Sequence, residues 1–414
     1  MAELAVLEVR LHGRPIGTLT RLPGDRNIFA FDQNYIDNPE RPTLSLSFKD
    51  AFGELITDVR PTQTRLPPFF SNLLPEGAMR DYLATRAKVK TEREFFLAWA
   101  LGRDLPGALT IVSAREDALP PIDDDAEARA DGSIADDHAL RFSLAGVQLK
   151  FSAVKERTGG LSIPTDGIGG SWIVKLPSTK FAGVPENEFA MMELARRIGI
   201  DVPETKLIPL RQIRGLPTGI DMAGDAAFAI KRFDRSADGG GIHMEDFAQV
   251  FGVYPERKYE KASYRNIAKV LWVETGEPGI AEFLRRFVFN ALIGNADMHL
   301  KNWSLLYPDR RSAQLAPAYD FVSTIAYLPD DSLALTFVDS KAFQSLTRDQ
   351  LVRFAAKAGL PEKLTLDTAY DTVAAFADAW RAADDLSIEA KARRTINAHL
   401  KTIPIWTEVS GRRR

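Results

Sequence analysis

The sequence predicts an α+β fold in which a small antiparallel sheet with helices comes first, a mixed strand-and-helix lobe follows, and an all-helical lobe ends the chain. Residues 1 to 60 alternate apolar and polar positions in short runs such as LAVLEVRL and PIGTLTRL, and this period of two is typical of half-buried strands. The β-branched and aromatic run GGSWIVKLPS predicts a strand. Beyond Ser340, apolar residues at helical spacing recur in QLVRFAAKAGL, DTVAAFADAWRAA and SIEAKARRTINAHLKTI.

The chain of 414 residues is too long for one modest core, so several subdomains are expected. A polar, acidic and aperiodic stretch, which includes Pro120, Pro121 and the run Asp123–Asp125, reads as a surface linker. The chain is therefore expected to comprise an N-terminal subdomain (1–115), this linker (116–137), a lobe portion (138–236) and a helical lobe (237–414). Within the first subdomain, PPFFSNLLPEGAMRDYLATRAK and TEREFFLAWALG are predicted helices.

Composition excludes several classes of function. The absence of cysteine removes disulfides, thiolate metal sites and cysteine nucleophiles. A net charge of −3 gives no overall attraction for nucleic acid, so direct DNA binding is not expected. No stretch approaches the roughly 20 apolar residues of a membrane span, and the first residues lack the pattern of a secretion signal. We expect a cytoplasmic protein with no membrane association.

Two acidic and amide motifs near residue 300 carry the chemistry. In GNADMHLKNWSLL, Asp297 and Asn302 have the D-x-x-x-x-N spacing of a kinase catalytic loop, and Asp320 follows in PAYDFVS. Magnesium prefers oxygen ligands and keeps several waters, so Asn302 and Asp320 suffice with the phosphates of a nucleotide. Asp297 is then free to accept a proton from a substrate hydroxyl. Either motif alone is more often a turn, but both in this order favour a phosphoryl-transfer site.

The segments around these motifs predict a rigid support for them. Phe283, Phe287 and Val288 lie at helical spacing and indicate a buried helix that ends at Gly294. WSLLY and AYDFV read as short strands after it. A helix, a loop, a strand, a turn and a second strand in this order would bring Asp297, Asn302 and Asp320 together on one rigid surface.

A kinase also needs a cation near the phosphates and a carboxylate to hold that cation. Lys175 lies in the middle of the predicted strand, and the next segment, VPENEFAMMELARRIGI, is an amphipathic helix with Glu188 near its start. Because a buried lysine is costly without a partner, we expect a supporting ion pair between Lys175 and Glu188, with Glu186 as the rival partner. The alternative is a solvent-exposed lysine on an edge strand.

The segment FSLAGVQLKFSA is ambiguous from its residues alone. It has one glycine, Gly146, and matches neither the G-x-G-x-x-G loop nor the G-x-x-x-x-G-K-[ST] loop. Its small and polar residues suit a phosphate-binding loop or an ordinary turn; spacing alone says little, and without other knowledge the turn is preferred.

Taken together, the chain resembles the HipA-type serine/threonine protein kinases, the toxins of bacterial toxin–antitoxin pairs. The resemblance rests on seven segments in sequence order: FFSNLLPEG, SLAGVQLKFS, WIVKLP, NEFAMMELARRIGI, AIKRFDR, GNADMHLKNWSLL and PAYDFVS. It implies a protein-kinase-like two-lobed fold. One departure is Leu149 before Lys150, where some relatives have a polar or acidic residue.

The resemblance also implies roles for individual residues. Asp297 would be the catalytic base, Asn302 and Asp320 the metal ligands, and Ser143 the site of autophosphorylation that expels its loop and switches the kinase off. The nucleotide contacts that it implies are the loop residues Ala145, Gly146, Val147, Gln148, Leu149 and Lys150, with Lys175, the hinge residues Lys231, Arg232 and Phe233, and also His299, Lys301, Asn302, Tyr319 and Asp320.

The function implied is an ATP- and Mg²⁺-dependent kinase that phosphorylates a translation component, an aminoacyl-tRNA synthetase, and causes growth arrest and persistence. A HipB-like helix-turn-helix antitoxin would neutralise it, and DNA would be contacted only through that antitoxin. Two alternatives stay open. One is a small-molecule phosphotransferase, because such enzymes share the same lysine, aspartate and asparagine set. The other is a catalytically idle subunit that represses transcription with the antitoxin.

Overall fold

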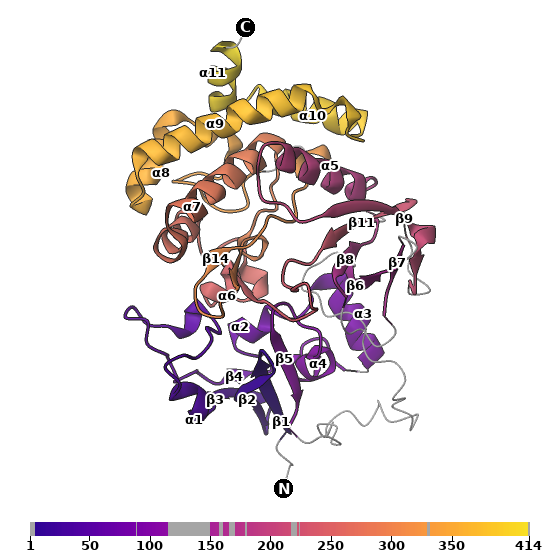
Figure 1. Ribbon diagram of the computed structural model, residues 1–414, viewed down its shortest axis with the longest axis vertical. Coiled ribbons are helices and arrows are strands. Elements are labelled where there is room, and N and C mark those ends of the chain that lie inside the picture. The colour runs from indigo at the N-terminus through magenta and orange to yellow at the C-terminus, as the bar shows by residue number, and fades with distance from the viewer. Residues whose placement is uncertain are drawn as a thin grey trace.

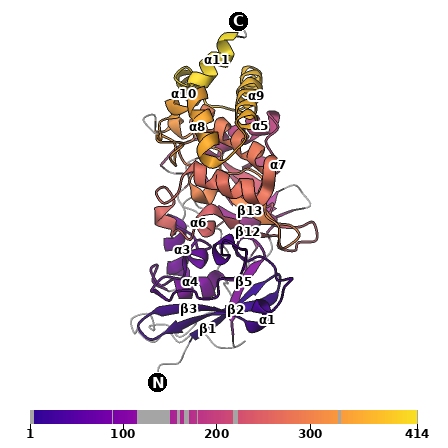
Figure 2. The same ribbon diagram turned by 90° about the vertical axis from the view of Figure 1, so that its left-hand side faces the viewer.

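The computed structural model describes residues 5–87, 89–114, 150–156, 160–164, 170–178, 180–216, 222, 224–328 and 332–412. The predicted linker and the loop residues 143 and 145–149 lie outside these ranges. Figures 1 and 2 show an elongated molecule with the N-terminal subdomain at one end and the C-terminal helices at the other. Within the described residues, none of the helices has the length and apolar character that crossing a membrane requires.

The N-terminal subdomain is built on a five-stranded antiparallel sheet in the order β4-β3-β2-β1-β5. Its strands are β1 (Ala5–Leu11), β2 (Arg14–Leu22), β3 (Arg26–Phe31), β4 (Thr62–Gln63) and β5 (Leu109–Ser113). Buried and partly buried residues alternate along β1, which confirms the predicted sheet. The edge strand β5 was not predicted, because it pairs with β1, which lies about 100 residues before it in the sequence.

Four helices accompany this sheet: α1 (Gln33–Ile36), α2 (Pro68–Ser71), α3 (Gly77–Ala87) and α4 (Glu94–Leu101). The predicted helix over residues 67–88 is two helices, because the chain leaves helical geometry at 72–76. Pro75 lies in this break, where a residue without an N–H cannot continue a helix. The segment between α2 and α3 faces the rest of the molecule.

The middle of the molecule is a six-stranded sheet in the order β10-β7-β6-β8-β11-β9. Its strands are β6 (Lys150–Lys155), β7 (Leu161–Ser162), β8 (Trp172–Lys175), β9 (Thr205–Pro209), β10 (Ile213–Arg214) and β11 (Ala226–Lys231). All pairs are antiparallel except β10 with β7. Helix α5 (Val184–Arg197) contacts β9 and β11. Lys175 is the last residue of β8, not a residue in its middle as predicted.

The last lobe is mostly helical, but it also contains a three-stranded sheet. Strands β12 (His243–Asp246), β13 (Ser304–Tyr307) and β14 (Gln314–Leu315) form this sheet. Strand β13 confirms the strand predicted over WSLLY, whereas the prediction that the lobe is all-helical was wrong. The helices are α6 (Phe247–Val250), α7 (Tyr264–Ile293), α8 (Arg348–Ala358), α9 (Glu362–Arg381), α10 (Ala390–Leu400) and α11 (Pro404–Arg412). Helix α7 is broken at Gly276, which adopts φ 65° just before Pro278.

Two hydrophobic cores meet at the middle sheet. One face, with Phe151, Trp172 and Val174, packs in a core shared with the N-terminal subdomain. The other face contributes Phe228 and Ile230 to a core shared with α5, α7 and the C-terminal helices. The sheet therefore joins both ends of the molecule into one packed unit.

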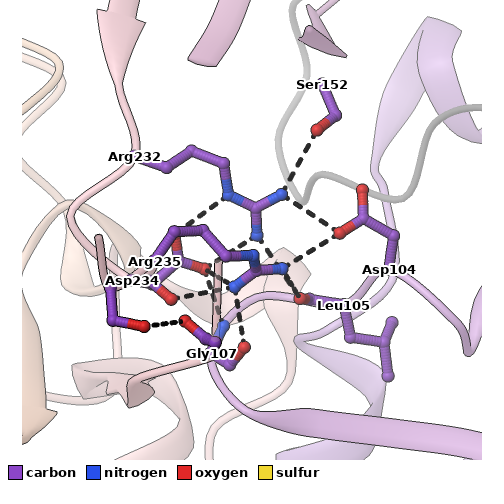
Figure 3. A network of polar contacts seen from close by, with 9 residues as sticks. Asp104, Leu105, Gly107, Ser152, Arg232, Asp234 and Arg235 are labelled. Carbon is purple, nitrogen blue, oxygen red and sulfur yellow. Dashed lines mark hydrogen bonds and ion pairs between the residues drawn. The ribbon is translucent and has the colours of Figure 1, made fainter. Parts of the chain in front are cut away.

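A buried ionic network fixes the N-terminal subdomain to the segment that follows β11 (Figure 3). Arg232 and Arg235 both contact one oxygen of Asp104, at 3.1 and 3.0 Å. Both arginines also contact Asp234, which accepts a hydrogen bond from the backbone N–H of Gly107 at 2.8 Å. Burial opposes ionisation of Asp234, but Arg232 outweighs it and lowers the pKa of Asp234 to about 2. The subdomain is thus anchored at the junction between the two lobes.

Candidate active site

The predicted motif around residue 297 forms a loop supported by its own amide side chains. Helix α7 ends at Gly294, whose left-handed φ of 66° turns the chain out of the helix as predicted. The side chain of Asn295 then donates to Asn290 at 2.8 Å and accepts from the backbone N–H of Asp297 at 3.0 Å. Asn302 donates from its side chain to the carbonyl oxygen of Asp297 at 2.8 Å. Asn295 was not singled out from the sequence, although it stands in the same GNAD motif.

The Asp297 carboxylate is 54% exposed and lies at the open side of the site. The hydroxyl of Tyr259 donates a hydrogen bond to it. The Nε2 atom of His299 lies 3.9 Å from the same carboxylate oxygen. Burial lowers the pKa of His299 to about 3, so this imidazole is neutral near pH 7. A neutral neighbour leaves the carboxylate with its capacity to accept a proton.

Asp320 occupies a backbone conformation that few residues other than glycine adopt. Its φ is 59°, and the segment 316–323 has no strand structure, so the predicted strand over AYDFV is absent. Aspartate tolerates the left-handed region better than most side chains, and such residues cluster at functional sites. The backbone oxygen of Asp320 accepts from the side chain of Asn295 at 3.2 Å. This contact ties Asp320 to the loop that carries Asp297.

Lys175 lies between two carboxylates. Its ammonium donates to Glu188 at 2.5 Å and also to Asp320. The structure thus contains the predicted ion pair with Glu188, which lies in the first turns of α5. Burial works against the charge of Lys175, but Asp320 and Glu188 outweigh it and raise the lysine's pKa.

The two carboxylates respond to this environment in opposite directions. For Asp320, burial opposes ionisation, but Lys175 and Lys150 outweigh it and lower its pKa to about 2. For Glu188, burial raises the pKa to about 7 despite Lys175, and the nearby charge of Asp320 adds to the rise. Asp320 is therefore the carboxylate that stays ionised near pH 7, and its side chain is also the more exposed of the two, at 27% against 1% for Glu188.

One cavity of about 900 Å³ brings the site together. Its lining includes every described residue of the predicted set: Lys150, Lys175, Glu188, Lys231, Arg232, Phe233, Asp297, His299, Lys301, Asn302, Tyr319 and Asp320. These residues come from β6, β8, β11, α5 and the segments before and after β13. Burial lowers the pKa of Lys150 to about 8. The remaining predicted residues, Ser143 and Ala145 to Leu149, lie outside the described part of the chain.

The predicted hinge residues Arg232 and Phe233 contribute to the cavity in different ways. The Arg232 side chain is fully buried in the network of Figure 3, so it has no free side-chain group for a ligand. The ring of Phe233 lies 5.6 Å from the ring of Tyr319, centroid to centroid. The hydroxyl of Tyr319 donates to the carbonyl oxygen of Lys301 at 2.9 Å. The aromatic rings of Phe233 and Tyr319 therefore lie next to the polar residues that line the cavity.

Two further acidic residues line the cavity. Glu76, in the break before α3, forms ion pairs with Lys301 and Lys258 at 2.7 and 2.8 Å. Asp246 caps α6 by accepting from the N–H of Gln249 at 2.8 Å, and burial raises its pKa to about 6. Glu76 lies far in sequence from the two lysines that it meets. Only the FFSNLLPEG segment gave a signal for Glu76, and it carried no chemistry by itself.

Comparison with known proteins places this arrangement in a family. The model of the HipA-like C-terminal domain matches residues 142–380, and that of the HipA N-terminal domain matches residues 7–112. Over 414 residues the chain is 55% identical to "Putative kinase Y4dM" of Sinorhizobium fredii, covering 99% of both proteins. It is 27% identical over 398 residues to the serine/threonine-protein kinase toxin HipA of Shewanella oneidensis, covering 88% of this chain and 86% of that protein.

A solved structure shares the fold. The chain matches a structure of the Shewanella oneidensis HipA, HipB and operator DNA complex with a TM-score of 0.72 and 22% identity, covering 98% of this chain and 97% of that one. The family models, the relatives and the kinase-like arrangement of the cavity agree: this chain belongs to the HipA-like kinase family.

Proposed function

We propose that this protein is a serine/threonine protein kinase that uses ATP and Mg²⁺. The observation that carries the proposal is the convergence of Lys175, Asp297, Asn302 and Asp320 on one cavity, with Lys175 held between Glu188 and Asp320. The donor set fits the metal, because an ionised carboxylate and an amide oxygen are hard ligands of the kind that Mg²⁺ prefers. The Asp320 carboxylate and the Asn302 side-chain oxygen would hold it.

The residues then divide the work of phosphoryl transfer. Magnesium-bound ATP supplies the phosphoryl group and a metal that neutralises charge on its oxygens. Asp297 orients the substrate hydroxyl and accepts its proton, since its carboxylate is the exposed one. Lys175 places its positive charge beside the phosphates, and Glu188 holds the lysine in that position. His299, Lys301 and Lys150 line the phosphate end, and the Lys231–Phe233 segment together with Tyr319 receives the adenine.

Replacing Asp297 tests this assignment. We expect Asp297→Gln to abolish transfer of radiolabelled phosphate from ATP and to keep Mg²⁺-ATP binding within a few-fold of wild type, because Lys175, Asn302 and Asp320 remain. Isothermal titration with a non-hydrolysable ATP analogue measures the binding. Retained phosphoryl transfer, or loss of nucleotide binding in this variant, would contradict the role of Asp297 as the base.

The biological setting proposed is that of a toxin. The acceptor would be a serine or threonine of an aminoacyl-tRNA synthetase, and the result would be growth arrest and persistence. A HipB-like helix-turn-helix antitoxin would bind the kinase and carry it to DNA; the matched Shewanella oneidensis protein was solved with HipB and operator DNA. Phosphoproteomics of cells that express the wild-type chain or Asp297→Gln would identify the acceptor. A phosphorylated metabolite with no phosphorylated protein would instead indicate a small-molecule phosphotransferase.

Ser143 is the proposed site of autophosphorylation. A phosphoserine carries nearly two negative charges and would repel a triphosphate in the same loop. We expect the wild-type chain to inhibit itself slowly on preincubation with Mg²⁺-ATP, and Ser143→Ala to keep the initial rate of transfer and to lose this inhibition. Mass spectrometry of the wild-type chain after such preincubation locates the phosphate, and finding it on another residue would refute this part.

A further inference from the structure

Lys301 belongs to the 295–302 loop, yet its ammonium is held by the N-terminal subdomain. It lies 2.7 Å from Oε1 of Glu76 and donates to the carbonyl oxygen of Asn72 at 3.0 Å. The Lys301 side chain is 6% exposed, so these partners replace water as its surroundings. Both come from the FFSNLLPEG segment, which is about 225 residues away in the sequence.

Glu76 holds a second lysine at the same time. Its other oxygen, Oε2, accepts from Lys258 at 2.8 Å, and the Lys258 side chain is also nearly buried. Glu76, Lys258 and Lys301 all line the cavity that contains Asp297. Burial opposes the ionisation of Glu76, but Lys301 and Lys258 outweigh it and lower the pKa of Glu76 to about 2. One permanent negative charge therefore separates two positive charges.

The segment that carries Glu76 is firmly attached to the last lobe. The side chain of Asn72 donates to the carbonyl oxygen of Val253 at 2.7 Å. The side chain of Gln249 donates to the carbonyl oxygen of Phe69 at 3.0 Å. With α2 packed against α6, these contacts give the carboxylate a fixed place opposite the loop.

We propose that Glu76 is a positioning residue of the active site, which holds Lys301 at the phosphate end of the cavity from a separate subdomain. This inference rests on the proposed kinase function and adds a component to its site. Without the carboxylate, Lys258 and Lys301 face one another as like charges in a poorly solvated place, where repulsion is strong. Lys301 then moves out of its position beside the phosphates. Misplacing such a group lowers the rate of the chemical step more than it weakens binding.

The test compares two Glu→Gln variants in the full chain. Glu76→Gln removes the bridging charge. Glu256→Gln is the matched control, because Glu256 also pairs across to the N-terminal subdomain, with Arg65 at 2.6 Å, but is exposed and does not line the cavity. Steady-state release of ADP and inorganic phosphate from Mg²⁺-ATP, with water as the phosphoryl acceptor, gives kcat and KM. We expect Glu76→Gln to lower kcat by roughly tenfold to a hundredfold with a small change in KM, and Glu256→Gln to match wild type.

A double variant separates positioning from a general structural role. If Glu76 acts through Lys301, then Glu76→Gln/Lys301→Gln loses no more kcat than Lys301→Gln alone. Glu76→Asp, which keeps the charge with a shorter reach, should restore part of the rate. If Glu76→Gln does not fold, the kcat of Glu76→Asp is compared with that of Glu256→Gln instead.

The outcomes are distinct. Three results would each overturn the positioning role: a kcat of Glu76→Gln equal to that of Glu256→Gln, fully additive losses in the double variant, or no rescue by aspartate. In each case turnover by the wild-type chain leaves the kinase proposal standing. A wild-type chain that binds no Mg²⁺-ATP would overturn the proposed function itself.

Discussion

At Glu245 a buried carboxylate is satisfied by three uncharged donors. It accepts hydrogen bonds from Ser45 at 2.5 Å, from the N–H of Leu46 at 3.0 Å and from the hydroxyl of Tyr307. Burial raises its pKa to about 7, although these donors work in the opposite direction. Ser45 and Leu46 belong to the N-terminal subdomain, and Glu245 belongs to β12. The contact between these two parts of the molecule therefore depends on the protonation of Glu245.

The sign of that sensitivity follows from proton binding. Between pH 4.5 and about 7 the folded state keeps a proton on Glu245 that the unfolded state has already lost, so stability falls as the pH rises. The full loss is at most about 3–4 kcal/mol for a shift of this size. We expect Glu245→Gln to reduce the fall in the free energy of unfolding between pH 5 and pH 8.

At pH 5 the wild-type side chain is protonated and, like glutamine, both donates and accepts hydrogen bonds, so the two proteins should be closest in stability at that pH. Urea unfolding of both proteins at pH 5, 6, 7 and 8 measures the difference. Parallel pH profiles for the two proteins would show that Glu245 does not titrate in this range.

At the scale of elements, the end of α7 decides where the 295–302 loop begins. Gly294 has φ 66°, and a Cβ at this position would clash with Cδ1 of Ile325 and lie 2.5 Å from its Cγ1. Ile325 is buried, so it has little space to move away. Glycine is required here both by the backbone and by the close approach of the 324–326 turn.

Gly359, at the end of α8, allows these two effects to be separated. It has a similar φ of 72°, but a Cβ at this position would have no neighbour within 4 Å. We expect Gly359→Ala to cost only the backbone strain, about 1–2 kcal/mol. Gly294→Ala should cost a further 1–3 kcal/mol or so from overpacking and should also lower kcat, because Asn295 and Asp297 follow directly. Denaturant unfolding with ATP turnover checks both; equal losses in the two variants would count against the steric argument.

The sequence predicted the elements whose signals are local. The helix stop at Gly294, the strand before Lys175 and the pairing of Lys175 with Glu188 depend on periodicity, a glycine and a spacing of 13 residues. The strand predicted over AYDFV failed because the contacts of Asp320 with Lys175 and Asn295 hold the backbone at φ 59° instead. Edge strand β5 and the partners of Lys301 could not be predicted from the sequence, because each contact joins segments that are far apart in the chain and that no local pattern relates.

At the scale of the whole molecule, the two subdomains behave as one unit because they share a core and a buried ionic network. The middle sheet packs against the N-terminal subdomain through one face and against the last lobe through the other. Asp104 then supplies the charge that Arg232 and Arg235 share at the junction. The end of the cavity next to Phe233, which we propose receives the adenine, is therefore built on a contact with the N-terminal subdomain.

Removing Asp104 should weaken that junction. Asp104→Ala leaves Arg232 and Arg235 buried with Asp234 as their remaining carboxylate, and breaking a buried pair costs about 3–5 kcal/mol. We expect a lower midpoint of thermal unfolding, or an early separate transition of the N-terminal subdomain, and weaker Mg²⁺-ATP binding. Asp385→Ala is the matched control, because its pair with Arg197 is exposed and worth at most about 1 kcal/mol. Scanning calorimetry with and without nucleotide measures both variants. If Asp104→Ala unfolds at the same temperature as Asp385→Ala and binds nucleotide as wild type does, the network does not couple the subdomain to the site.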